Sequence, residues 1–167
     1  MADILKEVVI PVATGGLLTL IVTRHYERTN EKRIVFAKSY ETVLAWQEML
    51  YRVRRREDGQ EAERKLVNRF HDLQELLNYN QGILSAESKS LGKSYKRFVT
   101  KVKKENVDLI QEAWQQKTRK PYHGTPSNEK HPDINGIANE YLKDIRQWLV
   151  WWQLPKLAVW WRYRNVK

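Results

Sequence analysis

The chain has 167 residues, of which 30 are Lys or Arg and 20 are Asp or Glu, giving a formal net charge of +10. It contains no cysteine, which excludes disulfide bonds and thiolate metal sites. A chain of this length builds one domain with a sizeable core and leaves room for one appendage. The basic excess favours partners that carry phosphate, namely RNA or anionic lipid.

The N-terminal part contains the longest stretch without a charged residue, residues 8–23. A usual transmembrane helix has about 20 apolar residues, but long side chains at either end of a shorter span can reach the polar surface. A cleaved signal peptide is disfavoured, since the start is slightly acidic and charged residues follow directly. The sequence therefore predicts a transmembrane helix over residues 1–25, with a buried N-terminal helix as the alternative.

Basic residues directly after this stretch set the predicted orientation. By the positive-inside rule they place the N-terminus outside and residues 26–167 in the cytoplasm. The predicted protein is therefore a single-pass membrane protein. If several copies of the chain formed a ring around a pore, Arg24 and Arg28 would line the cytoplasmic mouth of that pore.

Small and weakly polar residues recur along one side of the predicted span. They are Thr14, Gly15, Gly16, Thr19 and Thr23. In lipid, small residues let helix backbones approach closely, and threonine hydroxyls find partners across the contact. A short span also favours oligomers. These features predict a homo-oligomeric ring, in which the stripe either packs the helices together or faces a lumen.

The rest of the chain predicts helices throughout. Apolar residues follow helical spacing from about 27 to 53, from 62 to an end near Gly82, from 91 to 113, and from 134 to a stop at Pro155. Residues 120–133 hold three prolines and a glycine and predict a loop. The predicted fold class is all-α, with the transmembrane helix followed by a helical bundle over residues 26–167.

One constellation has the residue types of a catalytic site. Arg64 and His71 are seven residues apart, which places them on nearly the same face of a helix. This spacing fits the loose R-x4–6-H pattern of HEPN proteins, helical bundles of which many cleave RNA without metal, by acid–base and electrostatic chemistry. In that pattern a polar residue commonly follows the arginine, whereas this chain has Lys65 at that position. We predict no catalysis, no metal and no cofactor, with a HEPN ribonuclease as the alternative.

The combination resembles the membrane-pore accessory proteins of type VI-B CRISPR systems, which are small HEPN-like membrane proteins. Residues 8–23, the helix around ERKLVNRFH and the basic aromatic ending carry this resemblance, which spans most of the chain. It implies a ring that perforates the inner membrane in antiphage defence. Its partners would be the lipid bilayer, further copies of the chain, and RNA or an RNA-guided nuclease complex. A membrane-tethered ribonuclease and a single-pass scaffold stay open as alternatives.

A basic stripe runs opposite the apolar positions of the helix predicted over residues 91–113. Its members are Lys93, Lys96, Arg97, Lys101 and Lys104, and no acidic residue occurs from Ser88 to Lys104. Such a stripe is either a solvated face or a contact surface for RNA or anionic lipid.

The C-terminal ending combines aromatic and basic residues. Five of the seven tryptophans follow residue 147, and no acidic residue follows Asp144. Tryptophan rings can stack on bases, settle at a lipid interface or pack between subunits. Packing between subunits is the first expectation, because such an ending has a large aromatic surface to cover.

Overall fold

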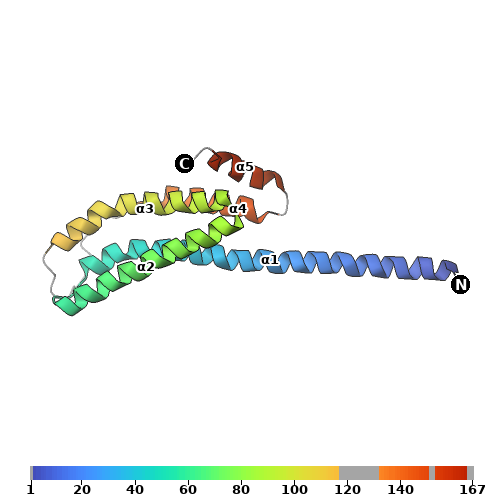
Figure 1. Ribbon diagram of the computed structural model, residues 1–167, viewed down its shortest axis with the longest axis horizontal. Coiled ribbons are helices and arrows are strands. Elements are labelled where there is room, and N and C mark those ends of the chain that lie inside the picture. Colours follow the sequence, from blue (N-terminus) through green and yellow to red (C-terminus); the bar gives the residue numbers. More distant parts are fainter. Residues whose placement is uncertain (1, 117–131, 151–152, 165–167) are drawn as a thin grey trace. The chain divides into compact units, whose positions relative to one another are not determined.

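A computed structural model describes residues 2–116, 132–150 and 153–164, without the side chains of residues 2–18, 21 and 153. The described residues form helices and no strand: α1 (Ala2–Arg54), α2 (Gln60–Glu87), α3 (Lys89–Gln115), α4 (Asn135–Leu149) and α5 (Gln153–Tyr163) (Figure 1). The predicted all-α fold class is confirmed. The loop predicted over residues 120–133 lies mostly outside the described residues.

The chain divides into two units, residues 1–36 and residues 37–167, and α1 contributes to both. The first helix continues from the first unit into the second, since α1 has no break before Arg54. The sequence offers none, because residues 27–54 contain neither glycine nor proline.

The predicted single-pass membrane localisation is wrong. Among the residues that the structure describes, no helix contains an apolar segment that is long enough to cross a bilayer. The uncharged stretch has sixteen residues, and α1 continues from it directly into Arg24, Glu27 and Arg28. A spanning helix needs about 20 consecutive apolar residues, and the snorkelling flanks that the sequence prediction relied on do not supply them.

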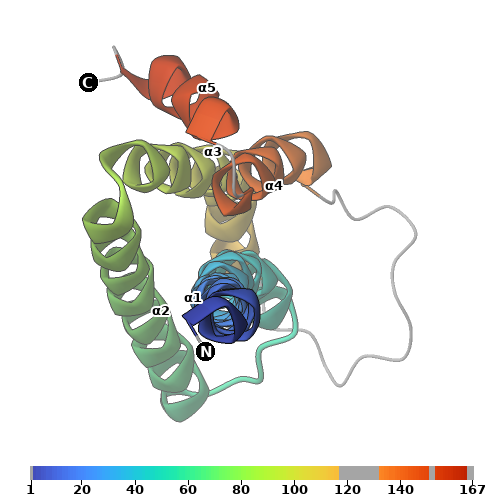
Figure 2. The same cartoon turned by 90° about the vertical axis from the view of Figure 1, so that its right-hand side faces the viewer.

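In the second unit, α2 and α3 are joined by a single residue, Ser88, and diverge from that junction (Figures 1 and 2). The Ser88 hydroxyl accepts a hydrogen bond from the Ser90 N–H at 3.2 Å and so caps α3. The sequence predicted that α2 ends near Gly82, but the helix continues to Glu87. Gly82 is exposed in the helix interior, where glycine costs about 1 kcal/mol relative to alanine, and burial of Leu84 beyond it stabilises the longer helix.

The two helices approach each other closely just after this junction. A Cβ atom on Gly92 would lie 2.9 Å from Cα of Ser85 on α2, closer than side chains pack. Gly92 is buried, so the close approach depends on the absence of a side chain there. This contact sets how α2 stands beside the first turns of α3.

Stacked aromatic rings form the core between residues 37–54 of α1, α3 and α4. The Phe98 and Tyr141 rings stack with centroids 4.9 Å apart, and Tyr95 lies 5.7 Å from Tyr141. Both tyrosine hydroxyls have partners on α1, because Tyr141 shares a 2.8 Å hydrogen bond with the Ser39 hydroxyl and Tyr95 donates to the Ser39 carbonyl. The core thus satisfies its buried polar groups while it buries large apolar surfaces.

Arg56, part of a run of three arginines, caps the C-terminal end of α3. Its guanidinium donates to the carbonyls of Ala113, Trp114 and Gln116 at 2.7, 3.0 and 2.6 Å, and lies 5.2 Å from the Trp114 ring. Carbonyls at a helix end lack intrahelical donors and carry partial negative charge, which a cation offsets. The side chain is only 8% exposed, so this arginine serves the fold and not the surface.

Asp144, fully buried on α4, fixes α5 to the rest of the unit. Its carboxylate accepts hydrogen bonds from the Ser94 hydroxyl of α3 at 2.7 Å and from the Tyr163 hydroxyl of α5 at 2.6 Å, and it pairs with Arg162. A buried carboxylate with three donors has the partners that burial of its charge requires. The sequence predicted a helix stop at Pro155, but this residue lies in the first turn of α5, where proline is tolerated.

Candidate nucleic-acid interface

A groove of about 480 Å³ lies where the end of α2 meets the first half of α3. Side chains of α2 form one wall and the basic face of α3 forms the other. The lining residues are Gln81, Ser85, Lys89, Gly92, Lys93, Lys96, Arg97, Thr100 and Lys101. Five of these nine are cationic and none is acidic, so the lining of the groove is basic.

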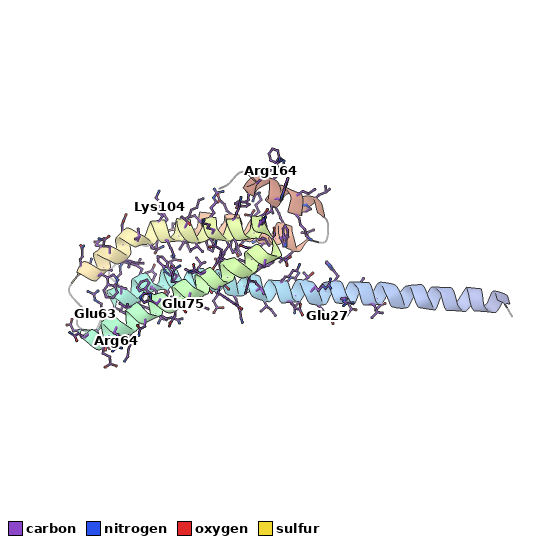
Figure 3. The ribbon with its side chains drawn as sticks, viewed as in Figure 1. Glu27, Glu63, Arg64, Glu75, Lys104 and Arg164 are labelled. Atoms are coloured by element: carbon purple, nitrogen blue, oxygen red, sulfur yellow. The ribbon has the colours of Figure 1, made fainter. Side chains whose placement is uncertain are left out.

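The structure gathers most of the predicted basic stripe in this groove. Lys93, Lys96, Arg97 and Lys101 line it, together with Lys89 at the first position of α3. Lys104 is exposed on the same helix but is not a lining residue (Figure 3). From Lys89 to Lys101 the cations extend over about 18 Å of helix, given a rise of about 1.5 Å per residue.

Three groove cations are held by neighbouring elements. The Lys93 ammonium donates to the Tyr163 carbonyl at the end of α5, with 3.2 Å between Nζ and O. Arg97 and Lys101 both contact Oε2 of Glu140 on α4, at 3.5 and 3.2 Å. One half-exposed carboxylate shared between two cations leaves a net positive charge along this side of the groove.

Lys89 and Lys96 are exposed and contact no carboxylate among the residues that the structure describes. They are therefore the groove cations whose charge is least committed within the chain.

Lys103 shows that position on α3 decides what a lysine does. Its ammonium lies 5.6 Å from the Trp46 ring and donates to Gln74 Oε1, away from the groove lining. Burial lowers the pKa of Lys103 because the charged form loses water. This lysine packs against the core side of α3, whereas Lys96 and Lys89 stay in water.

Arg64 and His71, the predicted catalytic candidates, lie on the exposed face of α2. Figure 3 shows Arg64 on the outer side of that helix. Leu73 and Leu77 of α2 face the core, and neither Arg64 nor His71 is part of the groove lining. In this structure the pair is a spacing of two exposed side chains along one helix.

The residues predicted to line a pore all belong to α1 within the first unit. The side chains of Thr14, Gly15 and Gly16 lie outside the described residues. Thr19, Thr23, Arg24 and Arg28 are exposed. In the part of the chain that the structure describes, no three His, Asp or Glu side chains are grouped as metal ligands.

Sequence reasoning missed the α2 wall of the groove, formed by Gln81 and Ser85. The available signal was Gly92, a lone glycine within the helical pattern LGKSYKRF, which indicates a close backbone approach.

Comparisons with protein-family models, with curated proteins and with solved structures find no match. The groove must therefore be interpreted from its own chemistry.

Proposed function

We propose that the second unit is a nucleic-acid-binding module that holds the phosphate backbone of RNA in the groove between α2 and α3. The single observation that carries this proposal is a groove lined by five cations and no acid. Lysine and arginine contacts to phosphates release condensed counterions, which supplies most of the affinity of sequence-independent nucleic-acid binding.

The extent of the cationic face favours a chain of phosphates over a single small anion. Cations spread along about 18 Å of helix cannot all reach one phosphate group, because each contact needs a donor–acceptor distance near 3 Å. A polynucleotide presents one phosphate after another and can engage successive turns of α3. Gln81, Ser85 and Thr100 add neutral hydrogen-bonding groups that suit phosphate and sugar oxygens.

The chemistry of the lining supports binding without cleavage. General acid–base catalysis needs a group that exchanges protons near neutral pH, and histidine or a shifted carboxyl group serves most often. The groove lining contains neither histidine nor a carboxyl group. His71 lies elsewhere on α2, on the exposed face. We therefore propose a role in binding and not in cleavage.

The pore depended on a membrane span and loses its support with that span. The ring of identical subunits and the nuclease partner stay predictions. Binding of RNA requires only the groove, and so is independent of both.

Binding of a fluorescently labelled single-stranded RNA, followed by anisotropy over a salt series, tests this proposal. The double variant Lys89→Gln with Lys96→Gln should bind about tenfold more weakly than the wild type, because two phosphate contacts are lost. The slope of log affinity against log salt should become shallower by about 1.4, because each of the two lost phosphate contacts to a single strand contributes roughly 0.7.

The matched control is Lys38→Gln with Lys143→Gln. It removes the same charge from exposed positions on α1 and α4, outside the groove. Its affinity should stay within about twofold of the wild type, apart from the small effect of net charge. Equal losses in the two double variants, or wild-type binding that salt does not weaken, would contradict the proposal.

A further inference from the structure

The C-terminal helix α5 exposes two adjacent tryptophans. Trp160 is 46% exposed and Trp161 is 74% exposed, while Val159 and Tyr163 of the same helix are buried. A large aromatic side chain left in water gives up the free energy that its burial would supply. Such a pair on a helix that is otherwise fixed by Asp144 indicates a surface that meets a partner.

The helix that carries the tryptophans also contains Tyr163, which contacts a lysine of the basic groove directly. Lys93 lines the groove, and its Nζ atom donates to the Tyr163 carbonyl at 3.2 Å. Trp160 is three residues before Tyr163, about one helical turn away. A ligand that follows the cations of α3 past Lys93 therefore reaches the end of α5 that carries the rings.

The charge beside the rings has the same sign as the groove. The Arg164 guanidinium lies 5.3 Å from the centre of the Trp160 ring, and Figure 3 shows Arg164 at the end of α5. No acidic residue follows Asp144, which is itself fully buried and bonded to Arg162. A second copy of α5 would bring these like charges together, which disfavours self-association through this face.

A single-stranded nucleic acid matches both features. Its phosphates complement the cations, and its unpaired bases present flat faces that stack on tryptophan whatever the sequence. A duplex offers the same phosphates but keeps its bases stacked inside. An acidic protein surface complements the charge and supplies no comparable set of flat rings.

We propose that Trp160 and Trp161 are a base-stacking platform that makes the groove selective for single-stranded nucleic acid. The phosphates lie along Lys89 to Lys101, and one or two bases stack on the rings beside Arg164. This inference rests on the proposed function, since it presumes that the groove binds phosphates. It adds that the ligand is unpaired at the platform and is read there by its shape and not by its sequence.

The experiment compares three labelled strands by anisotropy: a single-stranded RNA, an abasic strand of the same length, and an RNA duplex. The wild type should bind the single-stranded RNA about tenfold more tightly than the abasic strand, since one stacked base contributes roughly 5- to 150-fold in affinity. The duplex should also bind more weakly than the single strand. Trp160→Leu with Trp161→Leu should abolish the preference for bases, while the affinity for the abasic strand stays unchanged.

Two controls separate stacking from apolar contact. Trp160→Tyr with Trp161→Tyr keeps aromatic faces and should retain most of the preference for the base-containing strand. Leu154→Ala removes an apolar side chain that is 76% exposed on the same helix, and should change nothing. Circular dichroism should show the same helix content in every variant, because all the changed positions are exposed or half-exposed.

The results distinguish failure of the platform from failure of the groove. Equal binding of base-containing and abasic strands, with loss of both in Lys89→Gln with Lys96→Gln, overturns the platform and leaves the proposed function intact. Absence of groove-dependent binding of any strand overturns both. A loss in Leu154→Ala equal to that in the double leucine variant overturns stacking in favour of an apolar docking surface.

Discussion

The outer faces of α2 and α3 both carry charged residues at helical spacing, but only the face of α3 becomes part of a groove. Arg64 and His71 on α2 lie in solvent without a facing element among the described residues. Lys89 to Lys101 on α3 stand beside Gln81 and Ser85 of the preceding helix. A charged helix face becomes one wall of a groove where a second element supplies the opposite wall, and here α2 does so because it approaches α3 closely at Gly92.

The largest expected effect comes from Asp144 of α4, which accepts a hydrogen bond from the buried Ser94 of α3. Asp144→Ala removes the acceptor of Ser94, Tyr163 and Arg162 and leaves the two buried hydroxyl groups of Ser94 and Tyr163 without it. We expect a loss of about 2–4 kcal/mol in the free energy of unfolding, measured by urea denaturation, because two buried hydroxyl groups lose their acceptor. Glu140→Ala, which removes a half-exposed partner of Arg97 and Lys101, should cost less than about 1 kcal/mol. Similar losses in the two variants would show that Asp144 is not a fixing point.

The next effect concerns the α2 wall itself. Gly92→Ala places a Cβ atom against the backbone of Ser85 and forces the two helices apart. It should cost about 1–3 kcal/mol of stability and weaken RNA binding, because overpacking moves the backbone. Gly82→Ala is the matched change on α2, where a Cβ atom meets nothing within 4 Å, and should stabilise the protein by about 0.5–1 kcal/mol. Thermal unfolding of both variants checks the pair, and a stabilised Gly92→Ala would contradict the close approach.

A smaller effect is the pH dependence of the free energy of unfolding, which comes from buried tyrosines in the core behind the groove. Burial raises the pKa of Tyr95 from 10.0 to about 12, and burial also raises the pKa of Tyr163. A raised folded-state pKa means that the stabilising contribution is complete below pH 10 and is lost as pH rises toward 12. Chemical denaturation along an alkaline series should therefore show stability that falls above pH 10. Tyr95→Phe should show a shallower fall, and an unchanged slope would remove Tyr95 as the cause.

The smallest effect is expected on the face of α2 that has no second wall. Arg64→Ala with His71→Ala should change the free energy of unfolding by no more than about 0.5 kcal/mol, since both side chains are exposed. The affinity for RNA should also stay unchanged. Incubation with labelled RNA, followed on a denaturing gel, should give the same pattern for wild type and variant. Cleavage that disappears in the double variant would restore the ribonuclease alternative.

Much of the helical arrangement was predictable from local patterns, and the exceptions have physical causes. The all-α class and the continuity of the first helix follow from apolar spacing and from the absence of glycine and proline between residues 27 and 54. The end predicted at Gly82 was wrong, because burial of Leu84 outweighs the low helix propensity of one glycine. The stop predicted at Pro155 was wrong because proline also fits the first turn of a helix.

The candidate site was also predictable from the sequence only in part. Lys93, Lys96, Arg97 and Lys101 were identified as one surface, because residues three and four apart share a helix face in any environment. The second wall was not identified, since which helix stands opposite depends on contacts between residues distant along the chain. The capping role of Arg56 was missed for that reason too: its acceptors are nearly sixty residues away, and within the sequence it looks like one of three equivalent arginines.

The sequence by itself determined the all-α class and which side of α3 is basic, because both depend on residue spacing along a single helix. The tertiary structure decided which charges remain available. It buried Arg56 and Asp144 among partners and placed Lys103 against Trp46, and it left Lys89 and Lys96 beside the end of α2. The physical reason is that the free energy of a charge depends on its solvation and on the groups near it, and in a folded chain those groups come from other helices.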